Sequence, residues 1–370
     1  MPSFTTAREI VAGAGSVGCV GGRAAALGAR ALVVTGRSAM RKSGATDKAL
    51  SLLRAAGVEA AVFDQVEHDP DVTTVDAGRA ACRAARCDVA IGLGGGSTLD
   101  AAKAIAALVN EREPTADFVL GRPIAQPGLP FIAIPTTSGT GAEVTKNAVL
   151  SDRSRCLKQS IRAECMMPVV AIVDPELTLS CPPQVTAAAG MDALVQAIES
   201  FTSIHATPLT DALAFEAARR LIGSLAAAWE DGSDLAAREQ CAYGSLMAGM
   251  ALANARLGAV HGMAHPLGAR YGLEHGVVCA LLMPHVMRLN RGHVGDKYAR
   301  LSALAGGDIV GFVEGLVERF GLRHALDGVA IPREDYAAIA KESLPSGSLK
   351  ANPRKFTEGD VVAVLEALVQ

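Results

Sequence analysis

The sequence has few aromatic residues, little excess charge and no long apolar run. Its 370 residues include 35 Lys or Arg and 38 Asp or Glu, a net charge of −3 without a basic cluster. This excludes the electrostatic footprint of a nucleic-acid or anionic-membrane partner. No uncharged apolar run approaches the roughly 18 residues of a membrane span, and the N-terminus lacks the basic region of a signal peptide. We therefore expect a cytoplasmic protein, with no nucleic-acid or membrane partner, that acts on a small molecule.

The sequence also lacks paired cysteines. Its eight cysteines contain no CxxC pair, which argues against a zinc ribbon or a redox dithiol. We expect them to be reduced and mostly buried. They are Cys19, Cys82, Cys87, Cys156, Cys165, Cys181, Cys241 and Cys279.

What is present favours a compact α/β protein. Half of the residues are apolar, mean hydropathy is +0.27 and glycine occurs 38 times, a profile that excludes disorder, coiled coil and collagen. With aromatics at 4% and one tryptophan, Trp229, the core must consist of Ala, Val, Leu, Ile and Met. This composition suits helices that pack on a parallel sheet, and the length predicts two domains.

The order of elements changes near residue 183. Short β-branched runs alternate with helical patterns before that point, which is typical of a parallel α/β sheet. The predicted strands are 31–35, 59–63, 88–93, 131–134 and 169–173, and the predicted helices are 46–56, 72–86 and 97–109. Afterwards, Ala-rich segments of helical periodicity occupy 185–203, 207–229 and 234–256. We predict an α/β dinucleotide-binding domain over 1–183, an all-helical metal and substrate domain over 184–370, and a ligand cleft between them.

Residues 13–18 (GAGSVG) match the GxGxxG pattern of dinucleotide-binding loops. Such a loop requires an acidic residue at the end of the second strand, which holds the ribose 2′-hydroxyl. Here the second strand ends in Thr35-Gly36-Arg37-Ser38, which contains no carboxylate. We therefore interpret residues 13–18 as a structural turn, with a pyrophosphate loop as the alternative.

A stronger phosphate-binding candidate follows the strand 88–93. Residues 94–100 (GGGSTLD) join that strand to a helix, and three glycines allow an anion to approach the backbone closely. We expect Ser97 to cap the helix together with Asp100, so that the helix N-terminus faces the ligand. Residues 135–141 (PTTSGTG) add hydroxyl groups after the next strand, at the carboxyl edge where open α/β sheets bind ligands.

Histidines cluster in the helical half of the chain. His261 and His265 are spaced i, i+4, so they share one helix face, and His275 follows after a short interval. Asp192 and Gln196 have the same spacing on an earlier helix. Imidazole nitrogen and carboxylate oxygen suit Fe²⁺ or Zn²⁺, so these residues together form a candidate metal site.

Taken together, these motifs resemble the iron-containing (group III) alcohol dehydrogenase family over essentially the whole chain. The matching segments are GGGSTLDAAKAIA at 94–106, IPTTSGTGAEVT at 134–145, AIVDPELT at 171–178, GMDAL at 190–194, HGMAHPLG with its trailing HG at 261–276, and NPR at 352–354. The resemblance implies the fold shared by iron-containing alcohol dehydrogenases and dehydroquinate synthase. It also implies NAD(P)-dependent interconversion of an alcohol and its aldehyde or ketone, a divalent metal in the interdomain cleft, and a homodimer.

The same resemblance assigns roles to individual residues. The implied metal ligands are Asp192, Gln196, His261 and His275, and His265 would relay a proton beside them. The implied cofactor contacts are Gly36, Arg37, Ser38, Gly95, Gly96, Ser97, Asp100, Thr136, Thr137, Thr140, Asn147, Lys158 and Leu177. Gly95, Gly96 and Ser97 would hold the pyrophosphate, and the threonines with Lys158 the ribose and nicotinamide.

Two features depart from, or refine, the family pattern. Gln196 stands where the family usually has histidine, and a neutral amide oxygen is a weaker ligand than imidazole. The end of the second strand lacks the carboxylate that selects NAD, while Arg37 and Ser38 offer donors to a 2′-phosphate. We therefore predict a preference for NADP(H) over NAD(H), with Fe²⁺ or Zn²⁺ bound weakly.

Three alternatives remain open at this point. One is a metal-independent reductase of the maleylacetate reductase type, in which His265, with Gln196 as hydrogen-bond donor, polarises the carbonyl. Another is a cofactor-binding protein without turnover. A lyase like dehydroquinate synthase is disfavoured because the segment 185–285 contains few basic residues.

Overall fold

The computed structural model describes residues 3–155 and 157–369, and the chain forms two compact units. One unit comprises Thr6–Thr137 and Gly141–Cys181. The other begins at Pro182 and also includes Ser138–Thr140 and the N-terminal segment that ends at Thr5. The sequence prediction had assigned both short segments to the first domain. The backbone N–H and carbonyl of Thr5 bond to the side-chain amide of Asn254, at 2.7 and 2.9 Å, which ties this segment to the helical unit.

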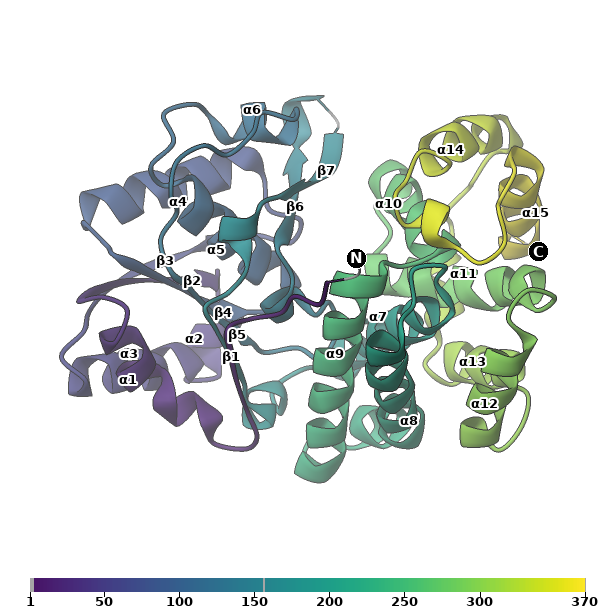
Figure 1. Cartoon of the computed structure of the whole chain (residues 1–370), viewed down its shortest axis with the longest axis horizontal. Coiled ribbons are helices and arrows are strands. Elements are labelled where there is room, and N and C mark those ends of the chain that lie inside the picture. The colour runs from purple at the N-terminus through teal and green to yellow at the C-terminus, as the bar shows by residue number, and fades with distance from the viewer. Residues whose placement is uncertain (1–2, 156, 370) are drawn as a thin grey trace. The chain divides into compact units, whose positions relative to one another are not determined.

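A six-stranded parallel sheet forms the centre of the first unit (Figure 1). Its strand order is β1-β8-β5-β4-β2-β3. The strands are β1 (Glu9–Ala12), β2 (Arg30–Gly36), β3 (Glu59–Val66), β4 (Val89–Gly94), β5 (Phe131–Pro135) and β8 (Val170–Val173). The five strands predicted from β-branched runs are all present in this sheet.

Alternating side chains of the strands enter two separate cores, one on each face of the sheet. Val33 and Ile91 face α1 (Val20–Ala25) and α3 (Ala45–Ala55). Leu32 and Ala90 face α4 (Val72–Ala84) and α5 (Gly96–Leu108) on the opposite side. Both faces are covered, which explains why the strands are near-continuous apolar runs rather than alternating ones.

A second, two-stranded antiparallel sheet was not predicted. It consists of β6 (Asn147–Asp152) and β7 (Leu157–Arg162), which pair from Asn147 opposite Arg162 to Asp152 opposite Leu157. The short helices α2 (Ala39–Lys42) and α6 (Thr115–Val119) complete the regular elements of this unit apart from single 3₁₀ turns: η1 (Ser16–Cys19), η2 (Ala142–Val144), η3 (Arg153–Arg155), η4 (Glu164–Met166) and η5 (Pro175–Thr178).

The second unit is helical, and residues 182–369 contain no strand. Its helices are α7 (Pro183–Thr202), α8 (Pro208–Glu230), α9 (Leu235–Ala255), α10 (Ala259–Tyr271), α11 (His275–Asn290), α12 (Gly295–Ala305), α13 (Ile309–Arg319), α14 (Tyr336–Ser343) and α15 (Glu358–Leu368). Single 3₁₀ turns, η6 (Leu322–Leu326), η7 (Arg333–Asp335) and η8 (Leu349–Ala351), connect the later helices.

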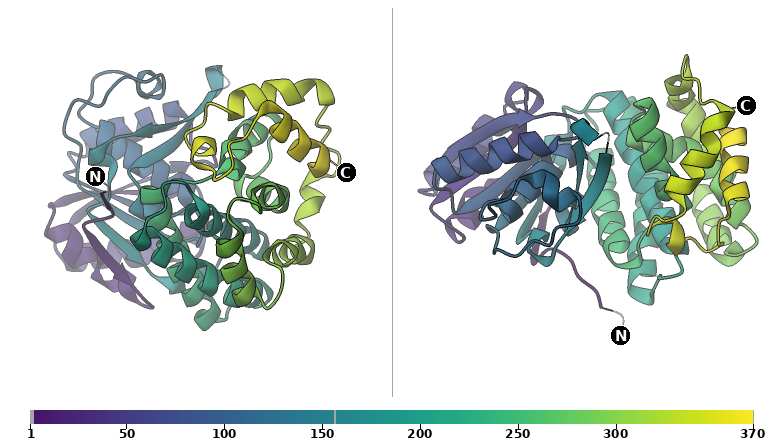
Figure 2. Two further views of the ribbon diagram at one scale, coloured as in Figure 1. Left: turned by 45° about the vertical axis from the view of Figure 1, so that its right-hand side comes forward. Right: turned by 90° about the horizontal axis from the view of Figure 1, so that it is seen from above.

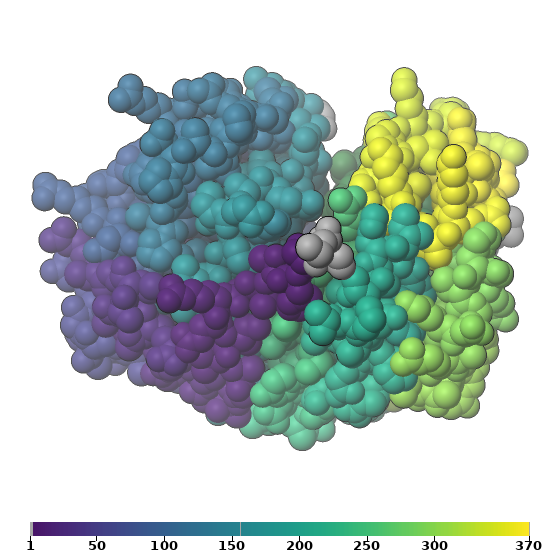
Figure 3. Space-filling view, viewed as in Figure 1, coloured from purple at the N-terminus to yellow at the C-terminus, as the bar shows by residue number. Residues whose placement is uncertain are grey.

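The long helices α7, α8 and α9 pack side by side (Figure 2), and α14 and α15 lie at the surface of this unit (Figure 3). Proline occupies the first turn of α7 and of α8, where its missing N–H has no helical partner. The Ala-rich sequence allows close helix packing. The ring of Trp229, at the end of α8, packs on that of Phe320 with centroids 5.0 Å apart.

The described cysteines are all free thiols, and Cys165 is exposed. Cys156 lies outside the described residues. None of the helices in the described part of the chain is both long enough and apolar enough to cross a membrane.

Candidate functional site

Most of the predicted cofactor residues of the first unit follow the carboxyl ends of β2, β4 and β5. The chain runs from β2 outward to β3 and then returns to β4 on the other side of β2. This reversal makes the β2–β4 junction the topological switch point, where open α/β sheets bind their ligands. Gly36 ends β2 and Gly94 ends β4, and a Cβ on Gly36 would lie 3.7 Å from Thr98 Oγ1 of α5. The structure therefore brings the Gly36–Ser38 and Gly94–Ser97 segments together.

The N-terminus of α5 is free of side-chain caps. The sequence prediction assigned the cap to Ser97 with Asp100, and this is wrong. The helix begins at Gly96, with Gly95 as an N-cap that makes no side-chain bond. Ser97 Oγ instead accepts from the N–H of Asp69 (3.3 Å), and Asp100 accepts from the N–H of Val149 (3.0 Å). An uncapped N-terminus after a glycine run leaves N–H groups and the positive end of the helix dipole for an anion.

Glycine is required in this loop because its neighbours approach closely. Gly94 has φ +159°, and a Cβ there would lie 2.6 Å from Thr98 Oγ1. The N–H of Thr136 donates to the carbonyl of Gly94 (3.0 Å), and a Cβ on Gly95 would contact the side chain of Thr137 at 3.4 Å. Thr136 and Thr137 therefore lie against the same loop.

The other predicted cofactor residues have different surroundings. Lys158 on β7 pairs with Asp69 (2.7 Å), whose N–H bonds Ser97, so Lys158 is linked to the loop. Asp100 and Asn147 instead make structural contacts, since Asp100 binds the backbone of β6 and the carbonyl of Asn147 accepts from the buried Lys103 (2.8 Å). The remaining two are Leu177, which is buried in the core beneath β8, and Thr140, which belongs to the other unit.

Arg37 and Ser38 are both exposed. Arg37 Nε donates to the backbone carbonyl of Gln65 (3.4 Å). Among the described residues Arg37 forms no ion pair, whereas nearby Arg41 pairs with Asp64 (2.7 Å). The guanidinium of Arg37 therefore retains a charge that is not neutralised locally.

The backbone N–H groups of the GxGxxG segment bond to a carboxylate of the same chain. Asp174, directly after β8, accepts from the N–H of Gly15 with one carboxylate oxygen and from the N–H of Val17 with the other, both at 3.0 Å. Gly15 adopts φ +76°, which turns these N–H groups toward the carboxylate. The segment also follows β1, an edge strand away from the switch point. These contacts agree with the interpretation as a structural turn.

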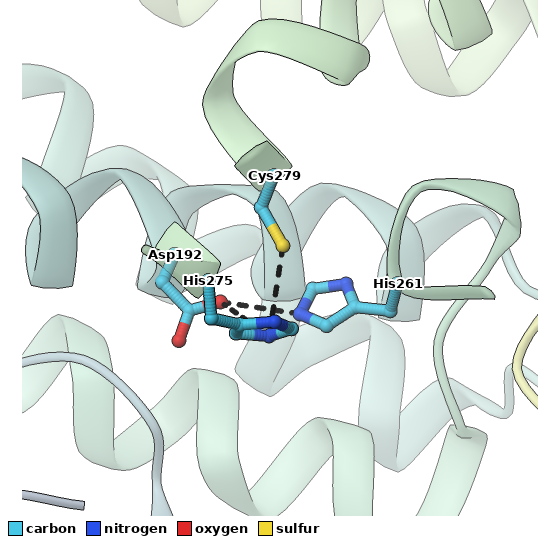
Figure 4. A group of neighbouring side chains, drawn as sticks. All are labelled: Asp192, His261, His275 and Cys279. Carbon is cyan, nitrogen blue, oxygen red and sulfur yellow. Dashed lines mark hydrogen bonds and ion pairs between the residues drawn. The ribbon is translucent and has the colours of Figure 1, made fainter. Parts of the chain in front are cut away.

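The predicted metal residues come together in the helical unit. Asp192 lies on α7, His261 on α10 and His275 at the start of α11 (Figure 4). Asp192 Oδ1 is 3.2 Å from His261 Nε2 and 3.8 Å from His275 Nε2. Asp192 and His261 are buried, whereas the His275 side chain is 29% exposed, so the cluster is accessible at His275.

A glycine next to His275 permits this approach. A Cβ on Gly276 would lie 2.2 Å from the carbonyl oxygen of Ala188 on α7. The first turn of α11 therefore packs directly on the backbone of α7, one turn before Asp192. Any larger residue would move His275 away from Asp192.

Glu199 determines which nitrogen of His261 faces the cluster. His261 Nδ1 is 2.6 Å from Glu199 Oε2, and the N–H of Val260 donates to Glu199 Oε1 (2.7 Å). A carboxylate only accepts, so Nδ1 carries the proton and Nε2 is the atom directed at Asp192. Such a carboxylate behind a histidine is typical of metal-binding histidines.

The groups of the cluster alter one another's protonation. Burial alone would lower the pKa of His261, but Cys279, Glu199 and Asp192 raise it well above its usual value. Burial would raise the pKa of Asp192, yet His261 and His275 bring it below its usual value. Positive charge, either as a proton on an imidazole or as a bound cation, is thus favoured among these side chains.

Gln196 leaves one buried acceptor of the site without a partner among the described residues. Its Nε2 donates to Asp192 Oδ2 (2.9 Å), which fixes the orientation of the amide. Its Oε1 is buried and has no hydrogen-bond partner among the described residues. An unpaired buried acceptor costs about 1–3 kcal/mol, and a donor such as the hydroxyl of a bound alcohol would satisfy it. The donor set of Asp192, His261 and His275 fits a divalent metal ion, and the orphan oxygen fits a hydroxyl group bound beside that ion.

His265 lies beside the cluster. Its ring stacks on that of His275, with centroids 5.1 Å apart and an interplanar angle of 24°. It is partly exposed and offers none of the clustered ligand atoms. This position agrees with a role next to the metal rather than on it.

The sequence analysis missed two members of the site. Glu199 lies one turn beyond Gln196 on α7, so the i, i+4, i+7 spacing of Asp192, Gln196 and Glu199 was the available signal. Cys279 lies one turn beyond His275 on α11, and its Sγ is 3.6 Å from His275 Nε2. Burial would raise the pKa of Cys279, but His261 and His275 lower it below its usual value.

Comparison with known proteins agrees with both halves of the chain. Residues 7–175 match the model of iron-containing alcohol dehydrogenase, and residues 186–369 match the C-terminal model of the Fe-containing alcohol dehydrogenase family. The chain belongs to the iron-containing alcohol dehydrogenase family. The architecture implied by the resemblance, an α/β domain with a parallel sheet followed by a helical domain, is confirmed.

Individual relatives of this dehydrogenase family are alcohol or aldehyde oxidoreductases. The chain is 38% identical over 366 residues to 1,3-propanediol dehydrogenase of Klebsiella pneumoniae, covering 95% of each chain. A crystal structure of 1,3-propanediol oxidoreductase superimposes with a TM-score of 0.94 at 37% identity, covering 100% of both chains. Sulfoacetaldehyde reductase of Bifidobacterium kashiwanohense, in complex with NAD⁺, gives a TM-score of 0.93 at 31% identity, covering 100% of this chain and 99% of that one.

Proposed function

We propose that this protein is an NADPH-dependent reductase of a small aldehyde, or in reverse an alcohol dehydrogenase, that uses a divalent metal. The observation that carries the proposal is the cluster of Asp192, His261 and His275, which is accessible only at His275. Glu199 contacts the far nitrogen of His261, and the unpaired Gln196 oxygen lies beside Asp192. The relatives of the chain support the reaction class. The choice of NADPH and of substrate is our proposal and is not taken from these relatives.

The residues of the chain perform distinct tasks in this reaction. Asp192, His261 and His275 would hold the metal, which would supply Lewis-acid polarisation of a carbonyl oxygen, and a nicotinamide cofactor would supply the hydride. The amides at the start of α5 bind the pyrophosphate, and Thr136 and Thr137 contact the nucleotide from the adjacent strand. An imidazole nitrogen of His265 provides the proton that converts the reduced carbonyl oxygen to a hydroxyl.

The preference for NADPH rests on the end of β2. Gly36 leaves room beside Thr98, and Arg37 and Ser38 are exposed. Arg37 forms no ion pair with any described residue, so its guanidinium can pair with a 2′-phosphate. No carboxylate follows β2 to accept from a 2′-hydroxyl. We also propose a homodimer, as the family resemblance implies, for which light scattering would give about twice the 38.0 kDa chain mass.

The decisive experiment compares NADPH oxidation by metal-stripped protein and by the same protein reloaded with Fe²⁺ or Zn²⁺. The substrates are a panel of small aldehydes and keto acids. We expect activity only after reloading. Equal activity in both preparations would refute the metal mechanism and support a metal-independent reductase, which the neutral amide of Gln196 favours. Cofactor binding without turnover in either preparation would identify a binding protein.

A further inference from the structure

Cys279 is a buried thiol within the cluster that the metal mechanism does not use. His275 and Cys279 are one turn apart on α11, so both side chains project from the same face of that helix (Figure 4). The Cys279 side chain is fully buried. Its Sγ, a carboxylate oxygen of Asp192 and one imidazole nitrogen each of His261 and His275 all lie within 4.8 Å of one another.

The spacing of these atoms resembles the edges of a coordination tetrahedron. A metal about 2.0 Å from nitrogen and oxygen and about 2.3 Å from sulfur has tetrahedral edges of about 3.3 Å between N and O and about 3.6 Å between N and S. The observed separations are 3.2 Å for His261 Nε2 to Asp192, 3.8 Å for His275 Nε2 to Asp192, and 3.6 Å for Cys279 Sγ to His275 Nε2. Small side-chain movements would complete the tetrahedron.

Gln196 is poorly suited to be the fourth ligand. Its Nε2 already donates to Asp192 Oδ2, so the amide serves to orient that carboxylate. Its oxygen is neutral, whereas a thiolate carries the charge and polarisability that bind Zn²⁺ tightly. The chain thus lacks an imidazole at position 196 and has a thiol in reach of the same centre.

We propose that Cys279 Sγ is a ligand of the metal, so that the protein ligands are Asp192, His261, His275 and Cys279, with Gln196 positioning Asp192. This inference rests on the proposed metal-dependent function. One carboxylate and one thiolate balance the two charges of a divalent ion. The mixed N, O and S donor set selects Zn²⁺ over Fe²⁺, because sulfur is the softer donor.

The test is titration of metal-free protein with Co²⁺, followed by absorption spectroscopy. A cobalt–thiolate bond produces an intense near-ultraviolet charge-transfer band, which nitrogen and oxygen ligands do not produce. We expect this band in the unmodified protein and its loss in C279S and C279A, with a fall in Zn²⁺ affinity of about 100-fold or more in competition with a chelator.

Matched variants separate ligation from general loss of a buried thiol. Cys241 on α9 is also buried, and it contacts Ser224 outside the cluster, so C241S should keep the band and the affinity. Q196A should keep the band as well. Visible d–d bands without a charge-transfer band would overturn the ligand assignment while leaving the metal-dependent function standing. Failure of the unmodified protein to bind either Co²⁺ or Zn²⁺ would overturn both.

Discussion

The two ring nitrogens of His261 have different partners. One nitrogen faces the proposed metal site, and the other is held by a carboxylate that orients the ring. Nδ1 faces the carboxylate of Glu199, whereas Nε2 faces Asp192. Glu199 itself is held by the N–H of Val260. Four of the residues that define the cluster were predictable because His261, His275, Asp192 and Gln196 stand in compact motifs. The contact of Glu199 with His261 was not, because 62 residues separate them.

Substitution of Glu199 by Gln tests the supporting role. The neutral amide no longer makes His261 Nε2 a stronger metal ligand, and it no longer fixes the tautomer of the ring. We therefore expect metal affinity to fall about 10- to 100-fold. Chelator competition with Zn²⁺ measures this. Glu314→Gln, which removes an exposed partner of Arg288, is the control and should change nothing. Equal affinities in E199Q and the unmodified protein would contradict the assignment.

A second residue, Glu143, makes stability depend on pH. Burial raises the pKa of Glu143 to about 7 from 4.5, with Lys103 opposing the shift. Between pH 4.5 and 7 the unfolded chain has released this proton while the folded chain retains it. The unfolded state then binds fewer protons, so the free energy of unfolding falls as pH rises through this window.

The variant E143Q cannot titrate and lacks this loss. We therefore compare the two free energies of unfolding at each pH. The difference, E143Q minus unmodified protein, should rise by up to about 3 kcal/mol between pH 4.5 and 7 and stay constant above pH 7. Denaturant unfolding at a series of pH values measures the difference. Parallel curves for the two proteins would show that Glu143 titrates normally in the fold.

At the scale of elements, two glycine-rich loops resemble each other in sequence but differ in what occupies them. The turn after β1 has an internal carboxylate, Asp174, whereas the turn after β4 opens the uncapped N-terminus of α5. The missing acidic residue after β2 already disfavoured the first loop. Its actual partner could not be predicted, because Asp174 is 157 residues from Val17.

Asp174→Ala distinguishes the two loops. The variant leaves the N–H groups of Gly15 and Val17 without their acceptor, so we expect the free energy of unfolding to fall by about 1–3 kcal/mol. NADPH affinity, measured by fluorescence titration under conditions in which both proteins are folded, should be the same in the variant and in the unmodified protein. A selective loss of NADPH affinity at full stability would instead identify residues 13–18 as a cofactor loop.

The end of β2 sets the cofactor preference under the proposed function. A Cβ on Gly36 would meet nothing closer than 3.7 Å, so the backbone position accepts a side chain and Gly36→Asp is a suitable variant. Its carboxylate would repel a 2′-phosphate, and we expect kcat/KM with NADPH to fall about 100-fold relative to NADH, a change of roughly 3 kcal/mol. Arg41→Ala, which breaks only the pair with Asp64, is the control. An unchanged ratio would place the 2′-phosphate elsewhere.

Helices and strands were predicted correctly where the local sequence pattern is enough to determine them. The five inner or well-marked strands and the long helices α7 to α9 follow from apolar runs and helical periodicity. The hairpin of β6 and β7 escaped notice because β7 (LKQSIR) is polar and largely exposed. β1 has only four residues, and its pairing with β8 depends on a segment about 160 residues later.

At the scale of the whole molecule, the residues of the proposed metal site and those of the proposed cofactor site belong to different units. Asp192, His261 and His275 belong to the helical unit, whereas Gly36, Gly95 and their neighbours belong to the α/β unit. A bound ligand stabilises the segments that contact it. Each ligand should therefore slow amide hydrogen exchange mainly in the unit that binds it.

Hydrogen exchange measured by mass spectrometry tests this separation. Zn²⁺ should slow exchange in α7, α10 and the first turn of α11. NADPH should slow it at the start of α5 and after β2. The protein without either ligand is the reference. Slowing by Zn²⁺ that is confined to the α/β unit would contradict the proposed metal site.

The packing of Trp229 on Phe320 has a practical consequence for observing the molecule. Because the chain has one tryptophan and it lies at the end of α8, all indole fluorescence originates in the helical unit. The α/β unit is silent when light excites indole selectively. The protein therefore contains a single intrinsic optical reporter, placed by its own sequence, through which unfolding of the metal-binding half can be followed without a label.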